Sequence, residues 1–419
     1  MHIESEATQH LQLAAQAARQ ASRVLAVSST AQRDAALHAM ARALRDAMPA
    51  VMAANAADLA ASESGPAFRD RLTLSEQRIA AMAQGLEDVA ALPDPLGATL
   101  ADWTRPNGLR IRRIATPIGV IGMIYESRPT VGADAAALCL KSGNAVLLRG
   151  GSESHNSAAA IHTALSKGLG DAGLPEACVQ IAPSTDRSYV AAMLAGAGLL
   201  DLIIPRGGKT LVERVQREAR VPVLAHAEGL NHTYIHAAAD PAMARAILAN
   251  AKMRRTGVCG ATETLLIDAA VAPALLPPIV ADLATLGCDF RVDAAARAIV
   301  PTLPAAGEAD FDTEWLDAIL SIRVVDGVAA ALAHIEAHGS AHTDAIVTED
   351  EAAAEMFLRG VDSAVALWNA STQFCDGGEF GFGAEIGIAT GRIHARGPVG
   401  LQQLTIYRYV VTGNGQVRP

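Results

Sequence analysis

Cys259 gives the strongest chemical signal in the sequence. It ends the segment RRTGVC (254–259), directly after an alanine-rich helical pattern whose last residues include Lys252, Arg254 and Arg255. Because nearby cations lower the pKa of a thiol and a glycine-flanked loop leaves sulfur accessible, the segment predicts a nucleophilic thiolate. The alternative is that the basic residues only complement a helix end and the thiol fills space in a core. The other cysteines fit that second interpretation (Cys139, Cys178, Cys288 and Cys375).

Two turns that contain glycine could bind an anion. Gly207 and Gly208 follow the apolar run 199–204 and precede a helical pattern, which predicts free backbone N–H groups at a helix N-terminus. Arg149 ends the apolar run 145–148, where a doubly wound sheet can contact an adenosine ribose or its 2′-phosphate. A tight strand-to-helix turn and a merely solvated arginine are the alternatives, and the sequence alone leaves them open.

Three histidines recur every four residues, as metal ligands on one helix face do (His334, His338 and His342). Gly339 breaks that helix, and no carboxylate completes an HExxH pattern. We therefore expect helix-end and loop histidines here, and no metal site.

The elements that must position these residues form two series. Short apolar runs alternate with helical patterns from residue 118 onward, which is typical of βαβ units around buried parallel sheets. The predicted strands are 118–125, 145–148, 179–182, 199–204 and 222–225, then 232–236, 264–267, 319–325, 345–347 and 364–368. The pattern predicts an α/β protein with two doubly wound domains that join near Gly229.

The N-terminal segment and two outlying segments complete the plan. Leu37, Met40 and Leu44 recur at the helical period, and Thr73 with Glu76 predicts a capping box before another helix. The segments 104–114 and 404–411 alternate like strands that leave a domain. Exposed strands need a partner, so we expect a contact between subunits.

Composition narrows the class of protein. The 419 residues can form two or three domains, and a net charge of −10 argues against broad contact with nucleic acid or an anionic membrane. The five cysteines form no CxxC pair, which is typical of reduced thiols in a cytosolic protein. The N-terminus lacks an apolar signal region, and the apolar stretch 190–204 is too interrupted to span a bilayer. We expect a soluble, cytoplasmic protein.

Motifs spread along the chain carry a family resemblance. In order they are GVIGMIYESRP (119–129), PRGGK (205–209), VPVLAHAEG (221–229), TGVCGATETL (256–265), DAIVTED (344–350), NAST (369–372), DGGEFGFGAEIG (376–387) and HARGPVG (394–400). Together they resemble the gamma-glutamyl phosphate reductases, a family of the aldehyde dehydrogenase superfamily, over about residues 5 to 411. The resemblance implies a cofactor-binding domain (1–102 and 116–229), a catalytic domain (230–399) and oligomerisation strands (103–115 and 400–414).

The resemblance also implies a reaction. It is the NADPH-dependent reduction of gamma-glutamyl phosphate to glutamate 5-semialdehyde and phosphate through a Cys259 thioester, the second step of proline biosynthesis. The expected partners are the small-molecule substrate and further copies of the chain, and an association with glutamate 5-kinase is left open. The alternatives are phosphate-independent aldehyde oxidation and a non-catalytic NADP-binding protein.

Residue roles follow from the same resemblance. The Cys259 backbone N–H is expected to stabilise the oxyanion, and Ser127 replaces the asparagine that does so elsewhere in the superfamily. Arg128 is an extra cation that could bind the acyl phosphate, the alternative being a structural pair with a carboxylate. Glu228 aligns with the glutamate that activates water in oxidising relatives. The expected cofactor contacts are Arg149, whose charge favours NADPH over NADH, together with Gly207, Gly208 and Glu379, the last at the nicotinamide ribose.

Overall fold

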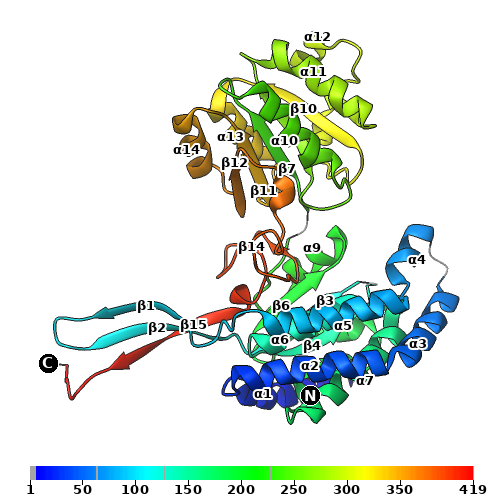
Figure 1. Ribbon diagram of the computed structural model, residues 1–419, viewed down its shortest axis with the longest axis vertical. Coiled ribbons are helices and arrows are strands. Elements are labelled where there is room, and N and C mark those ends of the chain that lie inside the picture. The colour runs from blue at the N-terminus through cyan, green and yellow to red at the C-terminus, as the bar shows by residue number, and fades with distance from the viewer. Residues whose placement is uncertain (1–5, 63–64, 127, 227, 419) are drawn as a thin grey trace, which may run out of the picture.

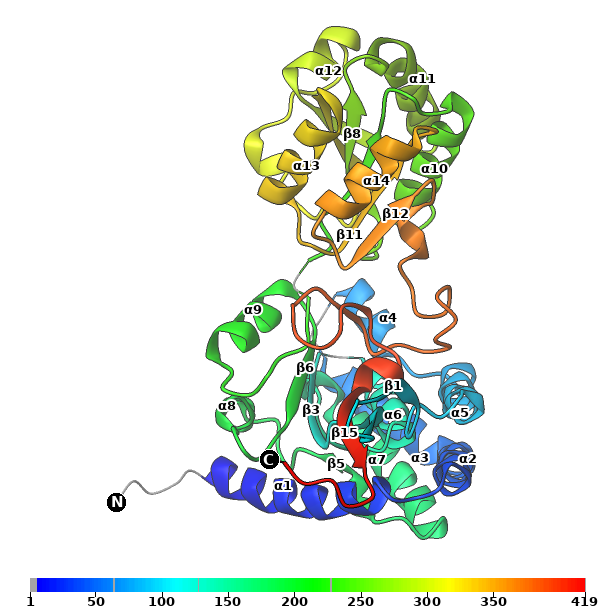
Figure 2. The same cartoon turned by 90° about the vertical axis from the view of Figure 1, so that its left-hand side faces the viewer.

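Two parallel sheets, each covered by helices on both faces, organise the chain (Figure 1). The computed structural model describes residues 6–62, 65–126, 128–226 and 228–418. Figure 2 shows the two sheet domains one above the other, with the N-terminal helices in the lower domain. The predicted α/β class with two doubly wound domains is confirmed.

The first sheet has four strands in the order β5-β4-β3-β6. Their bounds are β3 Val120–Tyr125, β4 Ala145–Arg149, β5 Val179–Ile181 and β6 Leu202–Arg206. Side chains of β3 alternate between two cores: Val120 and Ile124 pack on one face, and Ile121 and Met123 on the other. This period of two explains the continuous apolar run, because both faces of the sheet are buried.

Helices cover both faces of this sheet. One face packs against α1 (Glu6–Leu25), α8 (Arg187–Ala195) and α9 (Lys209–Glu218). The other face packs mainly against α2 (Thr30–Asp46), α5 (Glu76–Ala91), α6 (Thr130–Lys141) and α7 (His155–Asp171), with α3 (Met48–Ala61) and α4 (Pro66–Leu72) beyond them. The predicted capping box at Thr73 is wrong, because Ser75 is the N-cap of α5 and accepts from the Arg78 N–H.

The second sheet has six strands in the order β12-β11-β7-β8-β10-β9. Their bounds are β7 Asn231–Ile235, β8 Thr262–Asp268, β9 Asp289–Val292, β10 Ile319–Val325, β11 Thr343–Val347 and β12 Val365–Trp368. The helices α10 (Pro241–Met253), α11 (Ala272–Thr285) and α12 (Ala294–Ile299) cover one face, and α13 (Gly327–His338) and α14 (Glu351–Gly360) the other.

Within the two domain sheets, the predicted strands differ from the structure at two places. The run 222–225 forms no strand, and Val223 makes an isolated bridge to Ile203 of β6. The sequence pattern also missed β9, which is an edge strand of four residues with two charged side chains. Short, polar edge strands lack the continuous apolar run that marks buried ones.

A three-stranded antiparallel arm extends from the first domain (Figure 1). It consists of β1 (Thr99–Thr104), β2 (Arg110–Pro117) and β15 (Thr405–Thr412), in the order β1-β2-β15. The predicted strand 104–114 is wrong in its bounds, because residues 105–109 form the turn between β1 and β2. Its second part, in β2, pairs with β15, although the two strands are far apart in the chain. Large exposed apolar side chains gather on the arm (Leu100, Trp103, Ile406, Tyr407, Tyr409 and Val411).

The chain crosses between the domains twice. It enters β7 just after Gly229, and it returns after β12 through a segment that holds β13 (Ile388–Ala389) and β14 (Gly397–Pro398). Part of this returning segment packs in the core of the first domain, where Ile386, Ala389 and Val399 lie with residues of α5 and α6. In the described part of the chain, no helix combines the length and apolar character needed to cross a membrane.

Candidate active site

Cys259 lies at the junction between the two domains. It belongs to the loop between α10 and β8, so it stands at the amino edge of the second sheet. Arg206, the last residue of β6 at the carboxyl edge of the first sheet, acts electrostatically on its sulfur. Cys259 is partly exposed, whereas the other four cysteines are buried. Cys259 lies at the junction between the domains and is the least buried of the five cysteines.

The backbone of the Cys259 loop is held by β7. Asn231, at the start of β7, donates from its amide to the Cys259 carbonyl at 2.6 Å and to the Ala261 carbonyl at 2.9 Å. Its own side-chain carbonyl accepts from the Thr343 N–H of β11 at 3.1 Å. The fully buried amide therefore ties the cysteine turn to the neighbouring strand.

Gly229 makes a very close backbone approach to the nucleophile. A Cβ at this position would lie 2.1 Å from the Cys259 carbonyl oxygen, well inside van der Waals contact. The Gly229 N–H donates to the Glu314 carboxylate at 2.8 Å. Glycine is therefore needed here for space, independently of its backbone angles.

The change Gly229→Ala should displace the Cys259 turn and lower kcat by roughly 10²-fold, because displacing reacting groups by about an ångström has that effect. The matched control is Gly257→Ala on the same loop, where the nearest contact of a new Cβ is the Leu316 carbonyl oxygen at 3.7 Å. Steady-state rates of both purified variants check the prediction. Equal rates for the two variants would show that the approach of Gly229 does not position the sulfur.

The electrostatic setting of Cys259 differs from the prediction. Burial raises the pKa of its thiol to about 11, the Arg206 guanidinium opposes that rise, and the Glu314 and Glu385 carboxylates add to it. The prediction that Arg254 and Arg255 lower this pKa is wrong, because the cation that does so is Arg206. Arg254 instead contacts the Gln373 amide oxygen, and Gln373 donates to the Arg255 carbonyl.

Lys252, the third predicted cation, is occupied elsewhere. It is fully buried and pairs with Glu263 at 2.5 Å, and the Glu263 side chain is 2% exposed. Glu263 also accepts from the Leu316 N–H at 3.2 Å. The pair joins the last turn of α10 to β8 on either side of the cysteine loop, so it holds that loop in place.

Glu228 is not a free carboxylate. It pairs with Lys209, the first residue of α9, at 2.7 Å. This carboxylate raises the pKa of Lys209 above its ordinary value.

Arg128 lines an open cleft of about 430 Å³ between α4, α5 and the start of α6. Partial loss of solvent, Arg206 and Arg71 lower its pKa, in that order of effect. Arg71 and Arg78 line the same cleft, together with Asp134 and with Asp70, which pairs with Arg78 at 2.9 Å. Ser127, the predicted oxyanion donor, lies outside the described residues.

The glycine turn at Gly207 and Gly208 already holds a carboxylate. The Gly208 N–H donates to Glu126 at 2.8 Å, and a Cβ on Gly207 would lie 2.5 Å from the Glu126 carboxyl carbon. The N-terminus of α9 therefore accepts an anion, and in this structure the anion is the protein's own Glu126. Glycine at position 207 lets the two segments approach.

Arg149 is half-buried at the carboxyl end of β4. Its guanidinium donates to the Thr185 carbonyl at 2.6 Å and to the Gly150 carbonyl at 2.8 Å. Its Nε atom is buried with no hydrogen-bond partner among the described residues. Burial lowers the pKa of Arg149; the Glu153 carboxylate opposes this effect, and the neighbouring Arg187 adds to it more weakly.

Glu379 and Glu385 occupy contrasting positions in the returning segment. The Glu379 side chain is exposed, and its backbone N–H contacts Asp376 at 3.4 Å. Glu385 is half-buried, accepts from the Gly377 N–H at 2.9 Å, and acts on Cys259. The carboxylates that influence the sulfur are therefore Glu385 and Glu314.

Sequence reasoning gave no role to several residues that surround the sulfur (Arg206, His226, Glu314, His342 and Glu385). Three of them stand inside motifs that carry the resemblance: Arg206 in PRGGK, His226 in VPVLAHAEG and Glu385 in DGGEFGFGAEIG. Glu314 stands in the irregular segment before β10, where no periodicity gives a signal. As expected, the helix that carries His334 and His338 ends before Gly339, and His342 lies beyond it, close to Cys259.

Comparison with known proteins agrees with this architecture. The profile of the aldehyde dehydrogenase family matches residues 1–300. A gamma-glutamyl phosphate reductase of Acidiphilium cryptum is 70% identical over 409 residues, which are 98% of this chain and 97% of the relative. One of Gluconobacter oxydans is also 70% identical, over 99% of this chain and 97% of the relative.

Solved structures show the same fold. The crystal structure of gamma-glutamyl phosphate reductase from Thermotoga maritima superposes with a TM-score of 0.96 at 41% identity, covering 98% of this chain and 100% of that one. An acetylating aldehyde dehydrogenase from Geobacillus thermoglucosidasius shares the fold at 18% identity, with a TM-score of 0.66 and coverage of 99% and 98%. The chain therefore belongs to the aldehyde dehydrogenase family and, within it, to the gamma-glutamyl phosphate reductases.

Proposed function

We propose that this chain reduces gamma-glutamyl phosphate to glutamate 5-semialdehyde and phosphate, with NADPH as the cofactor, in the second step of proline biosynthesis. The observation that carries the proposal is the position of Cys259. It is the partly exposed cysteine, it lies at the junction of the two domains, and Arg206 acts on its sulfur. The names of two relatives at 70% identity support the same reaction.

The sulfur of Cys259 attacks the acyl carbon of the substrate. A carbon–sulfur bond forms, the bond from that carbon to the phosphate oxygen breaks, and phosphate leaves with the bonding electrons, which yields a thioester. Arg206 favours the thiolate that starts this step. After reduction at the same carbon, Cys259 departs as a thiolate and the aldehyde is released.

Cations beside the site suit a substrate that carries a phosphate and a carboxylate. Besides the loss of solvent, Arg206 and Arg71 lie close enough to Arg128 to lower its pKa. Guanidinium groups that gather at a cleft favour an anionic ligand, and they bind phosphate through two-point contacts. We assign Arg128 to the acyl phosphate, and we expect Ser127 to complete the oxyanion contacts begun by the Cys259 N–H.

The first domain has features that fit a dinucleotide. Strand order reverses between β3 and β6, and ligands of doubly wound sheets bind outside the carboxyl ends at such a point. The unpaired Nε of Arg149 and the cationic Arg187 nearby suit a ribose 2′-phosphate, and hence NADPH over NADH, although the Glu153 and Asp186 carboxylates also act on Arg149. Gly207, Gly208 and Glu379 complete the proposed cofactor contacts. When bound, NADPH supplies the hydride for the reduction.

The pairing of Glu228 favours reduction over the alternative of aldehyde oxidation by water. Hydrolysis of a thioester needs a general base for water, and Glu228 is held by Lys209 at 2.7 Å. Transfer of the acyl group from Cys259 to phosphate needs no such base, because phosphate itself attacks the thioester. A non-catalytic NADP-binding role gives no reason for a partly exposed cysteine whose backbone carbonyl Asn231 holds in place.

Phosphate dependence of the reverse reaction tests the proposal. Reduction of NADP⁺ by glutamate 5-semialdehyde should require added phosphate and form an acyl phosphate, and NAD⁺ should be a poorer acceptor. Cofactor absorbance follows the rate, and trapping with hydroxylamine detects the acyl product. Turnover to free glutamate in a phosphate-free buffer would favour the oxidising alternative, and no turnover in either buffer would favour the non-catalytic one.

The exposed arm supports an oligomer. Its apolar side chains include Trp103 and Tyr409, whose rings contact each other edge to face while both remain exposed. Exposed strands of this kind commonly pair across a subunit boundary, so we assign the arm to a homo-oligomeric contact. The need for a reduced thiol suits the cytoplasm. Association with glutamate 5-kinase would protect the acyl phosphate during transfer.

A further inference from the structure

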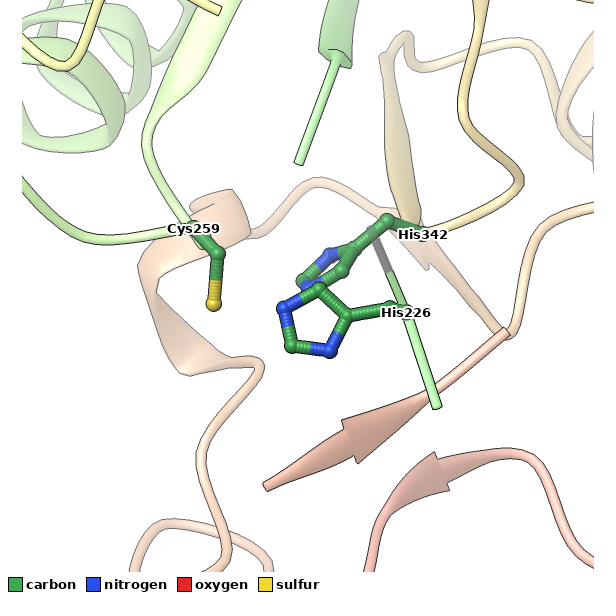
Figure 3. A group of neighbouring side chains, drawn as sticks. All are labelled: His226, Cys259 and His342. Atoms are coloured by element: carbon green, nitrogen blue, oxygen red, sulfur yellow. The ribbon is translucent and has the colours of Figure 1, made fainter. Parts of the chain in front are cut away.

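Two histidines accompany the sulfur of Cys259 (Figure 3). His226 comes from the crossing that leads to β7, and His342 directly precedes β11. One nitrogen of each imidazole and the Cys259 sulfur all lie within 4.8 Å of one another. The two rings meet edge to face, with their centroids 5.1 Å apart. Three side chains from distant parts of the sequence thus converge on one small space.

The hydrogen bonds of both imidazoles leave one nitrogen of each for a ligand. The Nδ1–H of His226 donates to the Ile388 carbonyl at 2.6 Å, so its Nε2 carries the lone pair. Figure 3 shows a ring nitrogen of His226 turned toward the sulfur. The Nδ1 of His342 lies 2.9 Å from the Thr343 hydroxyl, while its Nε2 is buried with no partner among the described residues.

Burial keeps both rings neutral. It lowers the pKa of His342 to about 3, and it also lowers the pKa of His226 despite the opposing Ile388 carbonyl. Neutral imidazoles whose other nitrogen is held by a protein oxygen are typical ligands of zinc, and a thiolate is another. His342 is 0% exposed, so leaving its nitrogen unpaired costs stability that a bound ion would restore.

We propose that His226, Cys259 and His342 form a site for Zn²⁺ or a similar soft divalent ion, which binds reversibly and blocks the nucleophile. The ion forms bonds to two Nε2 atoms and to the sulfur, and the thiol proton is released to solvent. Ligand atoms around tetrahedral zinc lie roughly 3.3–3.8 Å apart, so small rotations of the three side chains would bring their ligand atoms to the distances that zinc requires. The fourth position is left for water.

Cobalt binding to the full-length, metal-free protein tests the site directly. Titration with CoCl₂ should produce the near-ultraviolet charge-transfer band of a cobalt–thiolate bond and saturate at about one ion per chain, and ZnCl₂ should abolish the band. The change Cys259→Ser should remove the band. The change His226→Gln should weaken binding by at least roughly 10–100-fold, the loss seen when even an outer partner of a metal ligand is removed.

His338→Gln is the matched control, because His338 belongs to a histidine group without a thiol, where it contacts His334 and Asp312. It should bind cobalt like the unmodified protein. The absence of a charge-transfer band, or equal weakening in His226→Gln and His338→Gln, would overturn the site. His342→Asn should weaken binding as His226→Gln does, and His226→Gln decides the matter if His342→Asn does not fold.

Inhibition is a separate readout that rests on the proposed function. Zinc should stop turnover of the reverse reaction, a chelator should restore it, and bound zinc should protect Cys259 from iodoacetamide. Cobalt binding with these ligand requirements but full turnover would support the metal site and contradict the nucleophilic role of Cys259. Inhibition that is equally strong in His226→Gln would contradict the proposed ligand set.

Discussion

The change Cys259→Ala should lower the rate of the phosphate-dependent reaction by at least about 10⁴-fold while NADPH still binds. Removing the nucleophile of a covalent mechanism has effects of this size, because contacts to the transition state do not replace the bond that the nucleophile forms. No other cysteine can substitute, since the remaining four are buried. Steady-state kinetics of the reverse reaction gives the rate, and quenching of protein fluorescence gives the cofactor affinity.

The control for that experiment is Cys288→Ala. Cys288 lies in the core of the same domain, so its replacement tests whether the loss of a thiol or a small core cavity is enough to stop turnover. We expect Cys288→Ala to keep its activity within a few-fold. Residual activity above about 1% in Cys259→Ala, or an equal loss in both variants, would remove Cys259 from the proposed mechanism.

The position of the thiol could be predicted from local sequence, but its electrostatics could not. Glycines around Cys259 indicated a loop, and the structure has a loop there. The cation that acts on the sulfur, Arg206, comes from the other domain, and the adjacent Arg254 turns to Gln373 instead. The residues next to Cys259 in sequence therefore did not identify the cation that acts on its thiol, because neighbouring side chains of a turn point in different directions.

The parallel strands were predictable for a physical reason. Strands buried on both faces must be apolar nearly throughout, so β3, β4 and β6 appear as short, dense apolar runs. The run 222–225 has a similar composition but makes only an isolated bridge. The apolar composition of a segment indicates that it is buried. Whether the segment forms a strand depends also on backbone hydrogen bonds to a neighbouring strand, which the local sequence does not specify.

Contacts between side chains that are distant in sequence could not be predicted from the sequence. The turn at Gly207 has the pattern of an anion site, and the structure places the Glu126 carboxylate on it. His226 and His342 reach one sulfur because three segments that are distant in sequence meet there. Such convergence depends on tertiary contacts and leaves no periodic trace in the chain.

The change Lys252→Met should cause the largest loss of stability, roughly 3–5 kcal/mol, because it leaves Glu263 buried without its partner. Burial already raises the pKa of Glu263 from 4.5 to about 7 although Lys252 opposes the rise, so losing Lys252 raises it further. Between the ordinary and the raised pKa, the folded variant then binds more protons than the unfolded chain. Its stability should therefore fall as the pH rises through that window.

Combining Lys252→Met with Glu263→Gln separates charge from packing. The introduced amide is neutral yet can still accept from the Leu316 N–H, which Glu263 binds at 3.2 Å, so the double variant should recover roughly half of the loss or more. Urea unfolding at about pH 6 and about pH 8 measures the stability of each variant and its pH dependence. Of the two variants, only Lys252→Met should be less stable at the higher pH. If both variants lose the same stability at both pH values, the contribution of Lys252 comes from the packing of its apolar stem. The cysteine loop would then be held without help from the buried charge.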